Sequence, residues 1–494
     1  MQQNIERLHT ALLGAFVVVA LTLGYWQFFR QDEILARTTN PRLAEESQRV
    51  VRGKLLARNG EALAQSRVTD DGVVREYRNP GVAAVTGYHS LRYGNSGIEE
   101  RFDDYLRGAR SVDPFSAFAD QLFHRRTVGS DIVLTIDARV QQEAVDALGG
   151  EPGAVVALDP KTGAVLALAS APTFDPGNLD KAWASLVDNP GRPLFNRATQ
   201  SAYTPGSTFK VVTAAAALDL GLVDPNVPFR CTTPISIDRL SIDCRNHAHL
   251  PTVNYREAFA WSCNRTFGLT GLELGTGRLQ LADDLRAPYP WQGGIDGSAR
   301  RLEEYAERFK FGQPIPFELP VARSQLKGDT QWYPSLLAQT SFGQGELSAT
   351  PMLMALSAAT IANGGVVPKP SLALEARAPS GAVTRLFDGG NLGRAIKPET
   401  AATMNEMMVL SVDTAYAQPA RIPGVKVGGK TGTAEAGETG STPHSWFVGY
   451  APADNPRVAV AVILENRGSG TDFATPAAQR VMRVALDAYR PEGR

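Results

Sequence analysis

Three short stretches of the chain carry serine, lysine and asparagine at spacings that suit acyl transfer. In the first, TPGSTFKVV, Ser207 and Lys210 are three residues apart at the head of an apolar run that stops at Gly221. On a helix, that spacing puts both side chains on one face. A serine hydroxyl becomes a good nucleophile when a base takes its proton, and an apolar environment favours neutral, basic lysine. We therefore expect Ser207 to be a nucleophile and Lys210 its general base; the alternative is a helix cap followed by a surface charge.

The second and third stretches supply hydrogen-bonding groups and another lysine. WSCNRTF places Ser262 and Asn264 two residues apart, where both side chains either face a cleft or cap a helix. GGKTGTAE holds Lys430 after two glycines, and glycine within a strand often marks the close approach of a ligand. We expect Lys430 to begin an exposed edge strand, which can pair with an extended peptide through main-chain hydrogen bonds.

Two other stretches match these patterns but have simpler explanations. DPKTGAV repeats Lys-Thr-Gly at Lys161, yet two apolar strand-like runs flank it, and Asp-Pro-x-x-Gly is typical of a hairpin turn. We expect a turn there, with a solvated lysine. SQLK repeats Ser-x-x-Lys at Ser324 and Lys327, beside a proline-rich stretch. Only Ser207 begins an apolar helix after a Pro-Gly turn, so we expect no chemistry at Ser324.

Ser-x-x-Lys, Ser-x-Asn and Lys-Thr-Gly occur in that order at Ser207, Ser262 and Lys430, and this trio marks penicillin-binding proteins and β-lactamases. The chain resembles a class B penicillin-binding protein, most closely the compact penicillin-binding protein A type. RGKLLARNGEALA looks like a pedestal motif of that type, and SFGQGELSATPM and HSWFVGYAP look like transpeptidase signatures. The resemblance implies an α/β (α+β) fold with an antiparallel sheet flanked by helices, a small N-terminal pedestal and one transmembrane helix.

The resemblance also implies a peptidoglycan D,D-transpeptidase that cross-links stem peptides through a serine acyl-enzyme, serves division or elongation, and is inhibited covalently by β-lactams. Ser207 is then the nucleophile and Lys210 the base, while Ser262 and Lys430 relay a proton to the leaving amine. Asn264 binds the substrate amide. The terminal carboxylate is expected at Thr431, Gly432 and Thr433. Backbone N–H groups of Ser207 and Thr433 are expected to form an oxyanion hole, and no metal or organic cofactor is implied.

Other functions share the same motifs. A D,D-carboxypeptidase or a β-lactamase delivers the acyl group to water, but a secreted β-lactamase has no use for an anchor and a pedestal. A penicillin-sensing receptor needs a signalling module, and a scaffold of the division machinery is expected to lack at least one motif. All three motifs are intact in this chain.

The segment from Leu8 to Phe29 has no Asp, Glu, Lys or Arg, and its 22 residues are long enough to cross a bilayer. We expect an uncleaved anchor. A signal peptide is disfavoured because Tyr25 and Trp26 stand where small residues would mark cleavage, and a buried soluble helix is the third alternative. More arginines follow the segment than precede it, so charge alone does not fix its orientation.

The resemblance implies a single-pass protein of the cell membrane, with a short cytoplasmic N-terminus and an extracytoplasmic catalytic body. A polytopic glycosyltransferase of the cell-shape and division type is the implied partner. We expect a tail and anchor at 1–30, a pedestal at 31–128 and a transpeptidase domain at 129–494. Within the pedestal, Asn59-Gly60 predicts a hairpin turn.

Three cysteines are too few for a disulfide scaffold. Cys231 and Cys244 either form a disulfide, remain thiols, or bind zinc together with His247 and His249, although that spacing fits no standard zinc motif. The exported location that the resemblance implies favours the disulfide, with Cys263 left as a thiol near the active site. The formal net charge of −1 gives no electrostatic case for a nucleic-acid partner.

Overall fold

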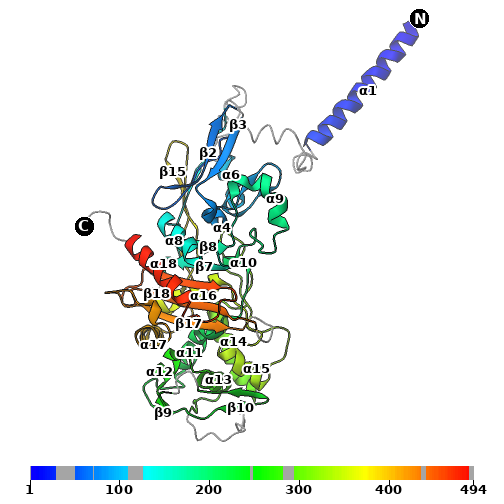
Figure 1. Cartoon of the computed structure of the whole chain (residues 1–494). Coiled ribbons are helices and arrows are strands. Elements are labelled where there is room, and N and C mark those ends of the chain that lie inside the picture. The colour runs from blue at the N-terminus through cyan, green and yellow to red at the C-terminus, as the bar shows by residue number, and fades with distance from the viewer. Residues whose placement is uncertain are drawn as a thin grey trace.

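The computed structural model describes residues 2–28, 50–70, 72–109, 126–244, 249–281, 294–435 and 441–488. His247, one of the possible zinc ligands, lies outside the described residues. Near the N-terminus, α1 (Gln2–Phe28) is one apolar helix, and its segment Arg7–Trp26 is long and apolar enough to cross a membrane. This helix is the anchor candidate of the sequence (Figure 1).

A six-stranded sheet forms the upper part of the body in Figure 1, in the order β15-β14-β6-β1-β2-β3. Its strands are β1 (Leu55–Leu56), β2 (Ala62–Thr69), β3 (Gly72–Tyr77), β6 (Asp131–Leu134), β14 (Ala373–Arg377) and β15 (Val383–Leu386). β1 and β2 pair antiparallel around Asn59-Gly60, and Gly60 has φ +84°, so the predicted hairpin is confirmed. Since the sheet takes strands from both sides of residue 129, the boundary between 128 and 129 stays a prediction.

A buried cluster of charges links Arg75 on strand β3 of this sheet to Arg52 and Glu99 elsewhere in the pedestal. Arg52 and Arg75 both bind the carboxylate of Glu99, with N···O distances of 2.9 and 2.6 Å, and Glu99 has no exposed surface. Burial alone would raise the pKa of the Glu99 carboxyl, but Arg75 and Arg52 together hold it below its ordinary value. Glu99 therefore stays ionised and compensates two buried guanidinium groups.

We expect Glu99→Ala to lower the free energy of unfolding by about 3–5 kcal/mol, because it leaves two buried cations without their shared anion. The matched control is Glu76→Ala on β3, whose partner Arg67 is 61% exposed. That change should cost at most about 1 kcal/mol. Denaturant unfolding of both variants measures the difference, and equal losses would contradict the argument.

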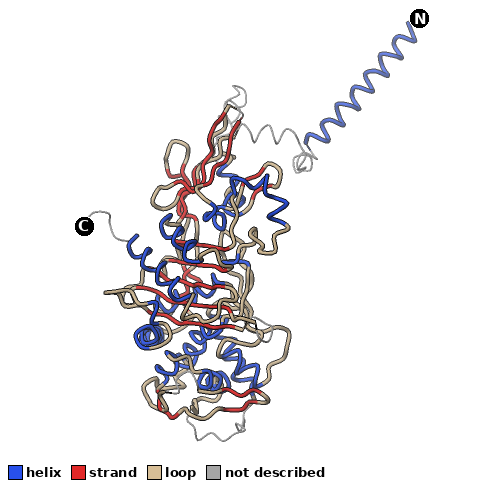
Figure 2. Tube along the Cα trace, viewed as in Figure 1, coloured by secondary structure: helices blue, strands red, loops and turns tan. Residues whose placement is uncertain are grey.

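A second sheet of five antiparallel strands lies at the centre of the body, in the order β17-β18-β19-β7-β8 (Figure 2). Its strands are β7 (Gly153–Leu158), β8 (Val165–Ala171), β17 (Gly428–Ala434), β18 (His444–Ala451) and β19 (Val458–Leu464). The central runs GAVVAL and VAVAVIL are buried at every position, because helices cover both faces of the sheet. β17 is an edge strand, so one side of its backbone is left unpaired by the sheet.

Helices cover the two faces of this sheet. α8 (Ala138–Leu148) and α18 (Ala474–Ala488) pack together on one face, with Val481 and Ala485 of α18 in the core. α16 (Pro351–Ala362) covers the other face and is buried over almost its whole length. α11 (Lys210–Asp219) and α17 (Pro398–Thr414) extend this second layer toward β17. The mixed α/β fold predicted from the resemblance is confirmed.

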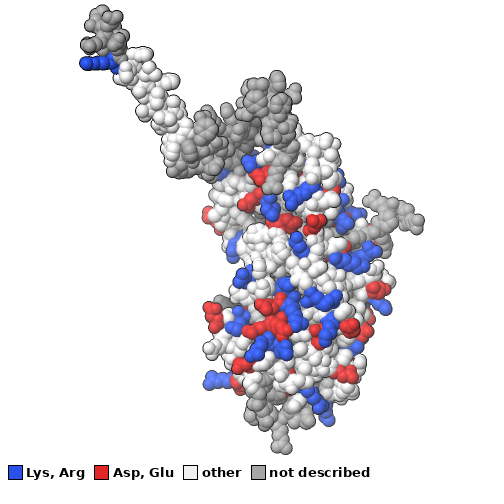
Figure 3. Space-filling model, turned by 180° about the vertical axis from the view of Figure 1, so that it is seen from behind, with Lys and Arg blue, Asp and Glu red and all other residues white. Residues whose placement is uncertain are grey.

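A mostly helical region lies below the sheet in Figure 1. It contains α12 (Tyr255–Ala260), α13 (Asn264–Glu273), α14 (Ile295–Arg308) and α15 (Pro334–Ser341). Leu302 and Tyr305 of α14 are buried against α11 and α13. Because α14 completes their packing, it is part of the core. On the face seen in Figure 3, positive and negative side chains are mixed, in keeping with the net charge near zero.

The remaining elements are short or lie at the periphery. They are η1 (Pro80–Val82), α4 (Ala83–Thr86), β4 (His89–Ser90), β5 (Gly94–Asn95), α5 (Gly97–Arg101), α6 (Asp103–Leu106), η2 (Pro176–Asn178), α9 (Leu179–Val187), α10 (Arg197–Gln200), η3 (Gly206–Phe209), β9 (Phe229–Arg230), β10 (Ile235–Ile237), β11 (Leu240–Ile242), β12 (Thr252–Val253), β13 (Val366–Pro368), β16 (Asn391–Arg394) and η5 (Gln418–Ala420). Of these, η3 positions the serine of the first motif.

Candidate active site

The first motif lies at the junction of η3 and α11. Ser207 falls in a 3₁₀ turn, and the α-helix itself begins at Lys210, three residues later than the sequence suggested. The turn is tight because Gly206, at φ +56°, packs against β17: a Cβ there would lie 2.7 Å from the carbonyl oxygen of Thr433. The half-buried Ser207 is thereby held beside the edge strand.

Lys210 is the centre of the site. Its Nζ lies 2.8 Å from Ser207 Oγ, 3.0 Å from Ser262 Oγ, 3.0 Å from Ser262 O and 2.6 Å from Asn264 Oδ1. The first and second motifs therefore meet at one nitrogen atom, although 52 residues separate Lys210 from Ser262. The Lys210 side chain has no exposed surface.

Burial lowers the pKa of Lys210 well below its ordinary value of 10.5, and the nearby charge of Lys430 lowers it further, whereas Cys263 opposes the shift. An ammonium group can only donate, whereas a neutral amine offers a lone pair to a hydroxyl proton. With Ser207 Oγ at 2.8 Å, the neutral amine is within reach of the proton that a nucleophilic serine must lose.

The second motif is a tight turn between α12 and α13. Ser262 has φ +60°, a left-handed conformation that is uncommon for a residue with a side chain. Cys263 N donates to Ala258 O at 2.8 Å, and α13 begins at Asn264. The turn brings Ser262 Oγ and Asn264 Oδ1 to Lys210, so neither side chain acts as the helix cap that the sequence left open. Such backbone strain is frequent at functional sites.

The third motif forms most of β17. The strand is at the edge of the sheet, as predicted, but it begins at Gly428 and the Lys430 side chain has no exposed surface. Lys430 Nζ donates to Thr431 O at 3.1 Å and lies 5.8 Å from the centre of the Phe259 ring. Burial lowers the pKa of Lys430 to about 7. The sequence missed this burial because α12, α17 and β18 cover the lysine from distant parts of the chain.

The two threonines of β17 differ in exposure. Thr431 is 6% exposed, whereas Thr433 is exposed and its Oγ1 accepts from Gly470 N at 3.3 Å. Gly432 lies between them, where a Cβ would come within 2.9 Å of Pro205 O. The strand therefore presents Thr433 next to the serine-bearing turn.

A glutamine that sequence reasoning did not single out contacts this strand. Gln344 Nε2 donates to the carbonyl oxygen of Thr433 over 3.3 Å. Its neighbour Gly343 has φ +97°, and a Cβ there would lie 1.7 Å from Gly206 O. The stretch SFGQG was noted as a family signature, and its glycine pattern was the signal for this close backbone packing.

The comparisons with known proteins agree with this geometry. Residues 153–483 match the family model described as penicillin binding protein transpeptidase domain, and residues 52–132 match the penicillin binding protein A dimerisation domain. The chain belongs to the penicillin-binding protein transpeptidase family. The resemblance seen in the sequence is confirmed.

Two named relatives and one solved structure are similar to this chain over most of its length. The peptidoglycan D,D-transpeptidase PbpA of Mycobacterium tuberculosis is 35% identical, covering 98% of this chain and 99% of the relative. The peptidoglycan D,D-transpeptidase MrdA of Acinetobacter baumannii is 30% identical over 78% of this chain and 59% of its own length. A ceftriaxone acyl-enzyme complex of M. tuberculosis penicillin-binding protein A superposes with a TM-score of 0.79, at 35% identity, over 90% of this chain and 99% of that one.

Within this family fold, the repeated patterns lie away from the site. Lys161 is exposed at the tip of the β7–β8 hairpin, where its Nζ donates to Asn455 Oδ1. Asp159 caps the turn by accepting from the backbone N–H of Lys161, so the predicted turn is confirmed. Ser324 Oγ accepts from Thr350 N, and Lys327 Nζ donates to two nearby carbonyl oxygens. Neither the repeated Lys-Thr-Gly nor the repeated Ser-x-x-Lys pattern contacts Lys210.

The cysteines lie beside the second motif. Cys231 and Cys244 form a disulfide, as expected, and Cys263 keeps its thiol. Trp261, which precedes Ser262, contacts the ring of Tyr416 with a centroid distance of 5.5 Å and that of His249 at 4.5 Å. His249 thus packs against an aromatic ring, while His247 lies outside the described residues.

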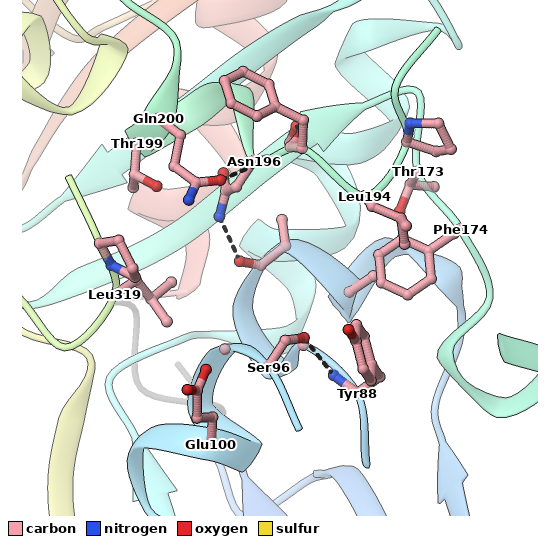
Figure 4. A pocket seen from close by; sticks show the side chains of 18 residues that line it. Tyr88, Ser96, Glu100, Thr173, Phe174, Leu194, Asn196, Thr199, Gln200 and Leu319 are labelled. Atoms are coloured by element: carbon pink, nitrogen blue, oxygen red, sulfur yellow. Dashed lines mark hydrogen bonds between the residues drawn. The ribbon is translucent and has the colours of Figure 1, made fainter. Parts of the chain in front are cut away.

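A separate cavity of about 220 Å³ lies where the pedestal meets the transpeptidase fold (Figure 4). Tyr88, Ser96 and Glu100 line it from the pedestal side, and Asn196 Nδ2 crosses the junction to donate to Ala84 O at 2.8 Å. None of the residues of the three motifs lines this cavity. The cavity therefore belongs to the junction and not to the candidate active site.

Proposed function

We propose that this chain is a peptidoglycan D,D-transpeptidase that cross-links stem peptides through an acyl-enzyme on Ser207, in division or elongation. The observation that carries the proposal is the position of Lys210 Nζ within 3.0 Å of Ser207, Ser262 and Asn264. A serine hydroxyl is activated by an adjacent general base, and a buried neutral amine can be that base. The close relatives named as peptidoglycan D,D-transpeptidases support the same reaction.

In the proposed acylation, neutral Lys210 takes the proton of Ser207 Oγ while that oxygen attacks the penultimate D-alanine carbonyl. The C–N bond to the terminal D-alanine then breaks, and the leaving amine needs a proton. Ser262 Oγ, 3.0 Å from Lys210 Nζ, is placed to pass that proton on, with Lys430 supplying positive charge nearby. Asn264 binds the amide of the substrate.

The carboxylate and the developing oxyanion are assigned to β17 and η3. Residues 431–433 receive the terminal carboxylate, and the protonated Lys430 adds charge to that contact. In a strand, the N–H and C=O of one residue point to the same side. Thr433 O accepts from Gln344 and lies 2.7 Å from where a Cβ of Gly206 would be, so the N–H of Thr433 also faces the free edge beside Ser207. With the N–H of Ser207, it forms the proposed oxyanion hole.

The alternative functions differ in the molecule that accepts the acyl group from Ser207. A D,D-carboxypeptidase or a β-lactamase uses water, and a penicillin-sensing protein keeps the acyl group. A scaffold protein does not require the Lys210 contacts to be complete, so their completeness favours an enzyme. The match of nearly the full chain to transpeptidases, pedestal included, favours an amine as acceptor.

We also propose that α1 anchors the protein in the cell membrane, with a short cytoplasmic N-terminus and the catalytic body outside. Support comes from the length and apolar composition of Arg7–Trp26 and from the location of peptidoglycan synthesis. A polytopic glycosyltransferase of the cell-shape and division type is the proposed partner, because cross-linking uses the glycan strands that such an enzyme makes.

A model pentapeptide ending in D-Ala-D-Ala, offered with a second peptide carrying a free amine, tests the reaction. The proposal predicts release of D-alanine and a cross-linked dimer as the main product. Hydrolysed tetrapeptide as the main product would identify a carboxypeptidase. No D-alanine release with stable acylation by penicillin would identify a sensor.

We predict a bell-shaped pH profile for the second-order rate constant of acylation by a carboxylate-bearing penicillin. At low pH the rate falls because Lys210 becomes protonated and loses its lone pair. Above pH 7 the rate falls because Lys430, whose pKa burial lowers to about 7, loses the charge that attracts the carboxylate. This constant reports the free enzyme. Lys430→Ala should abolish the alkaline limb and move the acid limb to higher pH, because the charge of Lys430 no longer lowers the pKa of Lys210. An unchanged alkaline limb would assign that limb to another group.

A further inference from the structure

Three sulfur atoms are gathered behind the second motif. Cys231 and Cys244 form the disulfide, and Cys263 Sγ lies 3.8 Å from Cys231 Sγ. All three sulfur atoms lie within 4.8 Å of one another, and all three side chains are buried. The thiol of Cys263 is therefore in contact with a disulfide bond that does not include it.

The surroundings of the cluster supply a hydrogen-bond donor to the Cys263 thiol and a cation to the neighbouring sulfur of Cys231. Thr266 Oγ1 donates to Cys263 Sγ at 3.2 Å, and the buried guanidinium of Arg265 donates through Nη1 to Cys231 Sγ at 3.4 Å. Cationic and hydrogen-bonding neighbours favour the ionised form of a thiol, which is the form that attacks disulfides. Both neighbours come from the first turn of α13.

The same cysteine is part of the catalytic turn. Cys263 lies between Ser262 and Asn264, and the side chains on either side of it both contact Lys210 Nζ. A disulfide needs an S–S distance of about 2.05 Å, so bonding Cys263 to Cys231 would move the sulfurs together by roughly 1.8 Å. Cys263 N and O are both tied into α12 and α13 by hydrogen bonds, so such a movement would reach its two neighbours.

We propose that Cys231 exchanges its disulfide partner between Cys244 and Cys263, and that the exchange changes the rate of acylation. The Cys263 thiolate attacks Cys231 Sγ, the Cys231–Cys263 bond forms and the Cys231–Cys244 bond breaks. Cys244 leaves as a thiolate and takes up the proton that Cys263 gave up. No oxidant or reductant is consumed. Since the three sulfurs form a compact triangle, the existing bond must first rotate into line with the incoming sulfur.

The described form, with Cys231 bonded to Cys244, is the one in which Lys210 makes all of its contacts. The exchanged form pulls Ser262 and Asn264 away from Lys210 and is therefore the slower form. This effect on acylation depends on the proposed function, whereas the exchange itself does not.

Peptide mapping can follow the exchange directly, since trypsin places each cysteine in its own peptide. The cleavage sites follow Arg230, Arg239, Arg245, Arg256 and Arg265. The full-length protein in detergent is equilibrated in a buffer of reduced and oxidised glutathione, quenched with N-ethylmaleimide and mapped without reduction. We expect peptide 231–239 linked in part to 240–245 and in part to 257–265. Cys263 alkylated in every molecule, or zinc bound to all three thiols, would overturn the exchange.

Two variants test the effect on acylation. In Cys244→Ser, oxidised glutathione should join Cys231 to Cys263 and slow acylation by a labelled penicillin roughly tenfold to a hundredfold, as misplacing catalytic groups by about 1 Å does. Dithiothreitol should restore the rate. In Cys263→Ser, the rate should be the same in both buffers. A Cys231–Cys263 bond without a change in rate would overturn the coupling. If the disulfide exchanges but no variant is acylated, the proposed function is refuted and the exchange is not. If Cys244→Ser fails to fold, peptide mapping of the wild-type protein still tests the exchange.

Discussion

Lys210→Met lowers the second-order rate constant of acylation by roughly 10²–10⁴-fold, the usual contribution of a general base. Methionine has similar length but no amine, so Ser207 keeps its place while its proton has no acceptor within 2.8 Å. The rate constant is measured with a labelled penicillin under pseudo-first-order conditions. Lys327→Met is the matched control, because it removes the lysine of the other Ser-x-x-Lys pattern, and it should leave the rate unchanged.

Folding must be checked beside this rate. Lys210 is buried and donates to Asn264 Oδ1 and Ser262 O, so its replacement also leaves these acceptors without a donor. Thermal unfolding of Lys210→Met reports that cost separately from catalysis. A folded variant that acylates within threefold of the wild type would mean that another group is the base.

The two copies of Lys-Thr-Gly should differ sharply in their effect on the same rate. Lys430 is buried in the site and is assigned the charge that attracts the substrate carboxylate. Lys430→Ala should therefore lower the acylation rate constant by a loss of about 2–4 kcal/mol in transition-state stabilisation, on the order of a hundredfold. Lys161 is exposed at a hairpin tip, so Lys161→Ala should change stability by only a few tenths of a kcal/mol and leave the rate unchanged.

Thermal unfolding of both alanine variants checks that each is folded before the rates are compared. Equal rates would show that the wrong copy has been assigned or that neither belongs to the site. A large loss of acylation rate in Lys161→Ala alone would assign the catalytic role to Lys161 in place of Lys430.

The chemistry of the site could be predicted from the sequence because it depends on residue types at short spacings. Ser207 and Lys210 are three residues apart, and the run of apolar residues after them made a buried lysine foreseeable. The turn at Lys161 was equally local, since Asp159 and Gly163 set its geometry without help from the rest of the chain. The order of the three motifs then indicated the family.

What the sequence did not give was decided by contacts between distant segments. The burial of Lys430 depends on α12, α17 and β18, and the 3₁₀ turn at Ser207 depends on Gly343 and Thr433 packing against Gly206. The contact of Gln344 with the edge strand has the same origin. The pairing of β14 with β6 joins residues more than two hundred positions apart, which no local pattern of a four- or five-residue strand reveals.

The attachment site of a labelled penicillin is the most direct test of Ser207 as the nucleophile. Trypsin places Ser207 in peptide 198–210 and Ser324 in peptide 324–327, so the two candidate serines are separated. After acylation, we expect the added mass on Ser207, and no covalent label in Ser207→Ala. Label on peptide 324–327, or label that persists in Ser207→Ala, would contradict the assignment of Ser207 as the nucleophile.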